Sequence, residues 1–327
     1  MTDLTALARV SAEIGANRLL VQGAGGNTSV KDAGVLWVKA SGCWLAQAMT
    51  ETIFVPVDLT RLLRALGEGD PACETSTDFV RADLCPPGLR PSIETTLHAG
   101  LPQRYVIHVH CVETIAHAAL VDGRARVAPL LDGLKWHWVP YRRPGLPLFQ
   151  AIEPGADVYV LANHGLVVAA DDLDVAVALA AEVRRRLARP LLGLAAEPAG
   201  GLAAGSNERS DYRAADAPAL KPHAVAKASG GTLYPDHMVF LGSGAAGLAA
   251  FDAPTPPDQP PLLLAPDAVP LVRADLTPAQ LAMALCLADV AARFAPDDRP
   301  RYLTPEEEYA LTHWDAERYR QTLSGTA

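Results

Sequence analysis

The sequence predicts an α/β fold followed by a smaller α+β region. Short apolar segments of strand length alternate with longer alanine- and leucine-rich segments at helical spacing. Half of the residues are hydrophobic, which is enough for a sizeable core. Pro, Gly, Ala and Ser then dominate residues 190–232, and this change of composition indicates a boundary. We therefore expect a main domain over residues 1–195, a linker over 196–230 and a C-terminal α+β extension over 231–327.

Composition excludes several classes of protein. The formal net charge is −9 without a long run of one sign, which argues against a nucleic-acid-binding surface. No apolar stretch is long enough to span a bilayer, and the first residues lack the basic region of a signal peptide. The five cysteines are odd in number and scattered, a pattern that favours reduced thiols. We expect a cytoplasmic protein with neither nucleic-acid nor membrane partners.

A glycine-rich loop follows the first expected helix, over residues 3–20. Gly23, Gly25 and Gly26 allow the backbone of residues 22–29 to approach a ligand closely, and consecutive amides there can bind an anion. A tight hairpin remains an equal alternative. A Rossmann fingerprint would need glycine at Thr28, and a P-loop would need a Gly-Lys-Ser/Thr sequence, which is missing here.

The next elements lead to a helix that begins with polar residues. Strands are expected over residues 35–40 and 53–57, a helix over 58–66 and a surface excursion over 68–90. Ser92 is a plausible N-cap for a helix that reaches Leu101. Glu94 lies in the first turn, where the helix dipole favours a carboxylate, although such acids are common at helix starts. His98 is expected to be a partly buried helix histidine.

Two histidines at the end of the strand over residues 105–110 form the first half of a candidate site. His108 and His110 lie on one face of that strand because side chains alternate between faces. His164 lies at a sharp bend between two apolar runs and can reach a neighbouring strand end. Three neutral imidazoles leave open positions on zinc, the pattern of a catalytic rather than a structural site.

A second class of protein, the cupins, also has a His-x-His pair followed by a glutamate. Glu113 follows His110 by three positions, close to that pattern. Cupins are nearly all β, however, whereas this chain alternates strands with long helices. The fold class therefore disfavours this alternative.

The C-terminal part continues with mixed elements. A helix over residues 172–188 precedes the boundary. Residues 232–241 are expected to form a turn into a strand, and residues 262–264 and 269–272 a hairpin. Two further helices are expected, over residues 277–294 and from residue 304, where proline occupies the first helical position.

Five motifs in one order resemble the class II aldolase/adducin family over about residues 5–190. They are Gly25-Gly26-Asn27-Thr28-Ser29, Lys39-Ala40-Ser41-Gly42, Pro91-Ser92-Ile93-Glu94, His108-Val109-His110 and Asn163-His164-Gly165. The C-terminal third is similar to the extension of longer bacterial members, including the Tyr234-Pro235-Asp236-His237 turn.

The resemblance implies a three-layer α/β/α sandwich around a mostly antiparallel sheet, assembled as a homotetramer. It implies that His108, His110 and His164 hold Zn²⁺ or another divalent transition metal, with Glu94 as the acid/base carboxylate. The residues implied to line a pocket for the substrate's phosphate are Asn27, Ser41, Gly42 and Ser92, with Thr28 nearby. A catalytic tyrosine is unassigned among Tyr302, Tyr309 and Tyr319.

The function that this resemblance implies is a metal-dependent aldolase, a carbon–carbon lyase. It would cleave a phosphorylated ketose or a related hydroxy-keto compound by retro-aldol chemistry, through an enediolate that the metal stabilises. Activity should fall as the pH drops through the imidazole range, because metal binding requires neutral histidines. The same site would also serve a sugar-phosphate epimerase, decarboxylase or dehydratase. A non-enzymatic adducin-like interaction module is a third alternative, but such modules typically lack the metal ligands.

Overall fold

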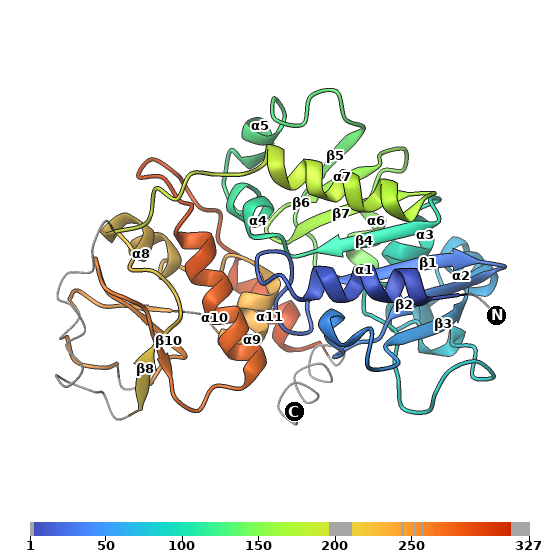
Figure 1. The fold of residues 1–327 in the computed structure, drawn as a ribbon, viewed down its shortest axis with the longest axis horizontal. Coiled ribbons are helices and arrows are strands. Elements are labelled where there is room, and N and C mark those ends of the chain that lie inside the picture. The colour runs from blue at the N-terminus through green and yellow to red at the C-terminus, as the bar shows by residue number, and fades with distance from the viewer. Residues whose placement is uncertain (1–2, 196–210, 243–244, 251–252, 257, 315–327) are drawn as a thin grey trace.

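A seven-stranded sheet forms the centre of the N-terminal part in the computed structural model of the protein (Figure 1). The strand order is β3-β2-β1-β4-β7-β6-β5, and neighbours are antiparallel apart from the parallel pair β5 and β6. The strands are β1 (Asn27–Asp32), β2 (Val35–Lys39), β3 (Phe54–Asp58), β4 (Tyr105–Val109), β5 (Trp136–Val139), β6 (Val158–Leu161) and β7 (Gly165–Ala170). The structure describes residues 3–195, 211–242, 245–250, 253–256 and 258–314.

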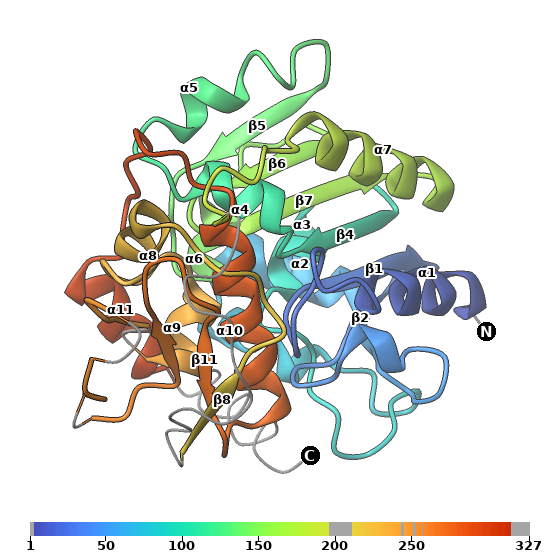
Figure 2. The same cartoon turned by 60° about the vertical axis from the view of Figure 1, so that its left-hand side comes forward.

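Helices cover both faces of this sheet, which gives the expected three-layer α/β/α arrangement (Figures 1 and 2). On one face, Ile107 of β4 belongs to the same hydrophobic cluster as residues of α1 (Thr5–Gly15) and α7 (Leu173–Arg186). On the other face, Val106 of β4 belongs to a cluster with residues of α3 (Thr95–Gly100) and α6 (Leu146–Gln150). His108 alternates with Ile107 and therefore points to the α3 side.

Shorter helices complete this part of the chain. They are α2 (Leu59–Glu68), α4 (Val112–Ala118) and α5 (Gly123–Val127), with 3₁₀ turns at Leu45–Gln47, Pro71–Glu74 and Thr77–Phe79. Residues 22–26 form the expected loop, and β1 begins at Asn27. The tight hairpin lies further on, where β1 turns into β2 at Ala33 and Gly34, both with positive φ.

The C-terminal region contains a second sheet, with strand order β8-β11-β10-β9. Its strands are β8 (Tyr212–Ala214), β9 (Ala246–Gly247), β10 (Leu262–Leu264) and β11 (Leu271–Arg273), and β10 and β11 form the expected antiparallel pair. Its helices are α8 (Pro222–Ala228), α9 (Pro235–Leu241), α10 (Pro278–Ala291) and α11 (Pro305–Thr312). One hydrophobic cluster joins α4 of the first part to α8, α9 and α10. The two parts are therefore packed together rather than tethered.

The strand expected within residues 232–241 is wrong, because residues 235–241 form helix α9. Pro235 occupies the first helical turn, where its fixed φ suits a helix and its missing N–H costs nothing. Val239, Phe240 and Leu241 are all buried, so the segment lacks an exposed polar face. A short apolar run that is buried all round carries no periodicity to separate a helix from a strand.

None of the described helices is long and apolar enough to cross a membrane.

We predict that Leu287→Ala lowers the free energy of unfolding by about 2–5 kcal/mol. Leu287 lies on α10 with no exposed surface, inside the cluster that joins α10 to α4, so its truncation leaves a cavity between the two parts of the chain. Denaturant titration followed by circular dichroism measures the change. Leu63→Ala on α2 is the control, because that side chain is 43% exposed. Equal, small effects of both substitutions would contradict the shared core.

Candidate metal centre

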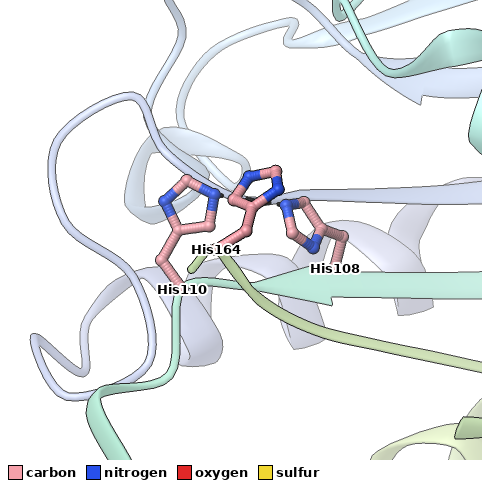
Figure 3. A group of neighbouring side chains, drawn as sticks. All are labelled: His108, His110 and His164. Carbon is pink, nitrogen blue, oxygen red and sulfur yellow. Dashed lines mark hydrogen bonds between the residues drawn. The ribbon is translucent and has the colours of Figure 1, made fainter. Parts of the chain in front are cut away.

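Three buried histidines meet where the central strand β4 of the large sheet ends (Figure 3). His108 and His110 come from the end of β4, and His164 comes from the turn between β6 and β7. Because β4 pairs with β7, with His108 opposite Val167, the turn reaches the β4 end. The ring centroids are 4.9–5.0 Å apart, and one nitrogen of each ring lies within 4.8 Å of the other two. The expected histidine cluster is thus present.

The hydrogen bonds of two of these rings fix their tautomers. His108 Nδ1 lies 3.0 Å from the carbonyl oxygen of Leu166, which can only accept, so Nδ1 is the donor. His110 Nδ1 lies 2.9 Å from a carboxylate oxygen of Asp236 and donates in the same way. In the neutral rings, both Nε2 atoms then carry lone pairs, and they face each other at 3.2 Å. A cation between these atoms would relieve their repulsion, so the donor set fits a divalent transition metal.

Glu94 faces the same point from the end of the loop before α3. Its Oε2 lies 3.2 Å from His108 Nε2, and its Oε1 lies 3.7 Å from His164 Nε2. Oε1 is buried without a hydrogen-bond partner among the described residues. Burial opposes ionisation of Glu94, but the positive charge that His108 carries when it is protonated outweighs it and holds the pKa of this carboxyl well below its usual range. The carboxylate is therefore charged and has an oxygen available to a ligand.

Asn27 holds Glu94 in place. Its Nδ2 donates to Glu94 Oε2 at 3.0 Å and to Ser92 Oγ at 3.1 Å. Its Oδ1 accepts from His98 Nε2, and His98 Nδ1 accepts from Ser29 Oγ at 2.7 Å. Burial lowers the pKa of His98 to about 3, so this ring is neutral and can act as donor and acceptor at once. His98 is fully buried rather than partly buried as expected, and it supports the site through Asn27.

The remaining predicted residues, apart from Thr28, gather around one pocket. The chain around Ser41 lies beside the chain around Ser92, because Ser41 N donates to Arg90 O at 2.9 Å and Ser92 N donates to Lys39 O at 3.1 Å. The predicted site residues that line the pocket are Asn27, Ser41, Gly42, Ser92, Glu94, His110 and His164.

The side chain of Thr28 does not line the pocket, so the expectation that it lies beside the substrate's phosphate is wrong. It follows Asn27 in β1, so the alternation of the strand turns it to the opposite face. There its hydroxyl lies 2.7 Å from Ser11 Oγ on α1. Thr28 therefore fastens α1 to the sheet and is absent from the pocket lining.

Glu113 also lies outside the histidine cluster. Its carboxylate pairs with Arg293 at 3.1 Å and with Arg184 at 3.6 Å. The cupin alternative is wrong on this ground and on the fold, because both sheets are packed with helices.

Sequence reasoning missed two charged residues of the pocket, Lys39 and Asp236. Lys39 is buried at the end of β2, where its Nζ donates to Ala24 O at 2.8 Å and Cys43 O at 2.7 Å. Its place in the Lys39-Ala40-Ser41-Gly42 motif, at a strand end, was the available signal. Asp236 comes from α9, so no local pattern relates it to His110.

The tyrosines considered for catalysis lie elsewhere. The hydroxyl of Tyr302 donates to Lys227 O at 2.9 Å, and the side chain of Tyr309 is largely exposed. Neither lines the pocket. Tyr319 is outside the residues that the structure describes.

Comparison with known proteins identifies the family. The model of the Class II Aldolase and Adducin N-terminal domain matches residues 5–189. The chain belongs to the class II aldolase/adducin family. The matched residues include the whole seven-stranded sheet and all three histidines.

Individual proteins are similar to part of this chain. The "Uncharacterized oxidoreductase YuxG" of Bacillus subtilis is 33% identical over 172 residues, which are 47% of this chain and 24% of that protein. The chain thus matches about a quarter of the length of that relative. The N-terminal class II aldolase domain of a Thermoplasma acidophilum protein is 29% identical, with a TM-score of 0.49, covering 57% of this chain and 92% of the other. An L-fuculose-1-phosphate aldolase from Thermus thermophilus is 17% identical, with a TM-score of 0.38, and the match covers 56% of this chain and 91% of that one.

We predict that the metal-free protein loses stability as the pH falls below about 6.5. Burial lowers the pKa of His98 and His237 to about 3 and that of His117 to about 4. The unfolded chain therefore binds these protons first, and folding free energy is lost as the pH falls from 6.5 toward the folded pKa values. Each group with a folded pKa near 3 would cost about 2 kcal/mol by pH 5.

Unfolding of the metal-free protein is measured by denaturant titration in the presence of a chelator at several pH values. His237→Asn should flatten the pH dependence by about one proton, because an amide oxygen can still accept from Leu233 N. His313→Asn is the control, since that ring is exposed. A stability that is constant between pH 7 and pH 5 would show that the buried rings do not stay neutral.

Proposed function

We propose that the protein is a divalent-metal-dependent aldolase that cleaves a phosphorylated ketose or a related hydroxy-keto compound. The observation that carries the proposal is the pairing of a buried three-histidine donor set with a charged carboxylate, Glu94, in one polar pocket. Membership of the class II aldolase/adducin family supports it. Zinc is the metal we propose first, because three imidazoles and an open position suit it.

The reaction divides one molecule into two carbonyl compounds. A substrate hydroxyl loses its proton and becomes the carbonyl of the aldehyde fragment. The adjacent carbon–carbon bond breaks, its electrons pass to the ketone fragment as an enediolate, and a proton returns to that carbon. A divalent metal held by His108, His110 and His164 supplies Lewis-acid stabilisation of negative charge on the substrate oxygens.

The protein's own groups hold the substrate and move the proton. We assign proton transfer to Oε1 of Glu94, because this oxygen is buried, faces His164 and has no hydrogen-bond partner among the described residues. Asn27 donates a hydrogen bond to the other oxygen, Oε2, and so keeps the carboxylate from rotating away. A fixed carboxylate beside the histidine cluster is the geometry that acid/base catalysis needs.

Other residues that line the pocket suit an anion. Ser41 and Ser92 provide hydroxyl groups, Lys39 provides a positive charge, and the loop at Gly25 and Gly26 provides backbone. Gly26 has a φ of +60°, and a side chain there would lie 2.9 Å from the backbone oxygen of His108. We propose that these groups receive the substrate's phosphate, with Ser41, Gly42 and Ser92 as its binding residues. The side chain of Asn27, also expected there, is occupied by Glu94, Ser92 and His98 and contributes by holding Ser92 and Glu94 in place.

Alternative reactions would use the same residues. An epimerase, decarboxylase or dehydratase would require the same metal site, and product analysis separates it from an aldolase. The three histidines and Glu94 argue against a non-enzymatic module. The homotetramer and the cytoplasmic location expected from the sequence stay predictions.

We predict that the metal-loaded protein splits at least one member of a panel of phosphorylated ketoses into a ketone and an aldehyde. Glu94→Gln should lower kcat by roughly 10²–10⁴-fold, because an amide cannot transfer the proton. Coupled detection of both fragments measures the rate, and metal analysis of the variant shows that the centre is kept. Glu182→Gln on the surface of α7 is the control. Full activity of Glu94→Gln would refute the aldolase assignment. So would a product that is an isomer of the substrate, or one formed from it by loss of carbon dioxide or water.

We predict that the purified protein binds one divalent metal ion for each chain and that His164→Asn abolishes this binding. The loss of one of three imidazoles leaves too few ligands for a stable site. Affinity should fall as the pH drops below about 6.5, because protons compete for the ring nitrogens. Competition with a chromophoric chelator measures both effects. His137→Asn is the control, since His137 lies on β5 outside the pocket. Equal affinities of the two variants would count against the site.

A further inference from the structure

A carboxylate from the C-terminal region contacts a histidine of the candidate metal centre. Asp236 Oδ2 lies 2.9 Å from His110 Nδ1, the ring nitrogen that faces away from His108 Nε2. We propose that Asp236 is a positioning residue for the metal, so that the C-terminal region forms part of the metal centre. This inference rests on the metal-binding part of the proposed function and is independent of the aldol reaction.

The position of Asp236 is fixed by the elements around it. Asp236 is the second residue of α9 and is 2% exposed, and His110 is 5% exposed. The start of α9 is held because Leu233 N donates to His237 Nδ1 at 3.2 Å. Leu233 and Phe240 belong to the hydrophobic cluster that joins α9 to α4 and α10. The carboxylate is therefore presented to His110 by a packed helix rather than by a free side chain.

The contact determines the state of the His110 ring. A carboxylate that accepts from Nδ1–H leaves the lone pair on Nε2, on the side of His108 and Glu94. A carboxylate partner also makes the imidazole a stronger ligand and fixes the angle of its ring. Asp236 thus holds the far nitrogen of the His110 ring, so that Nε2 would be presented to a metal ion at a fixed angle.

The glycine-rich loop of residues 22–26 packs against the hydrogen bond between Asp236 and His110. A Cβ atom at Gly25 would lie 2.8 Å from His110 Nδ1 and 2.9 Å from Asp236 Oδ2. The backbone at Gly25 therefore lies directly against the hydrogen bond and leaves no room for a side chain. Three separate segments of the chain meet at this contact: the loop before β1, the end of β4 and the start of α9.

A second contact connects the same region to His164. Asn163, with a φ of +52°, donates from Nδ2 to Leu233 O at 2.8 Å and to Arg301 O at 2.7 Å. The turn that carries His164 is thus held by the segment just before α9 and by the segment before α11. Two of the three histidines are positioned by residues outside the matched family domain, which ends at residue 189.

The test compares Asp236→Asn and Asp236→Ala with wild type in the full chain. Zn²⁺ affinity is measured by competition with a chromophoric chelator, and Co²⁺ is used for the visible spectrum of the loaded site. We expect both variants to bind Zn²⁺ roughly 10–100-fold more weakly and to shift the Co²⁺ bands. Asp289→Asn is the matched control, because Asp289 is also a buried aspartate of the C-terminal region and pairs with Arg18 at 3.4 Å. Its affinity should equal that of wild type.

A folding defect is separated from a metal effect by thermal unfolding with and without Zn²⁺. The rise in Tm on adding Zn²⁺ reports affinity for the folded state of each variant. A smaller rise for Asp236→Asn, with a wild-type rise for Asp289→Asn, supports the proposal even if Asp236→Ala fails to fold. Wild-type affinity and Co²⁺ bands in Asp236→Asn would overturn it. A wild-type protein that binds no metal would overturn this inference and the proposed metal site together. Binding without aldol cleavage would overturn only the proposed reaction.

Discussion

The site depends on one close approach between two ring nitrogens. Leu166 and Asp236 each accept from the Nδ1–H of a histidine, so His108 and His110 turn their Nε2 lone pairs toward each other at 3.2 Å. Such an arrangement is repulsive until a proton or a metal ion lies between the nitrogens. Glu94 brings a negative charge to the same point. The surrounding hydrogen bonds thus direct two ring nitrogens and a carboxylate toward one point, and this is the donor set that we propose for a divalent cation.

The sheet order explains how distant segments reach this place. β4 lies between β1 and β7, so Asn27 on β1 is opposite His108 and the turn before β7 delivers His164. His98 on α3 then reaches Asn27 from the α3 side of the sheet. Each contact joins an element on a different part of the chain. A change of one residue in the register of β1 would move Asn27 to the opposite face, as the position of Thr28 shows.

Much of the fold and the core of the site were predictable because they follow local rules. His108 and His110 share a face by strand alternation, Glu94 stands at a helix start, and Asn163-His164-Gly165 interrupts two apolar runs. The three-layer order and the meeting of these segments came from the family resemblance rather than from periodicity. Helix α9 was mistaken for a strand because its apolar residues are buried all round. Asp236 and His98 were missed because their roles are set by side-chain contacts across the fold.

The contacts of the C-terminal region have an energetic consequence for the whole chain. If the packing of α9 strengthens metal binding through Asp236, then thermodynamic reciprocity requires that metal binding strengthens the packing of α9 by the same factor. The hydrophobic cluster between α4 and α10 provides the non-directional part of this interface, and the Asp236–His110 and Asn163–Arg301 contacts provide its register. A shift of α9 along that apolar surface would break the hydrogen bond between Asp236 and His110, for which an apolar surface offers no substitute. The polar contacts therefore favour the arrangement in which His110 and His164 face His108.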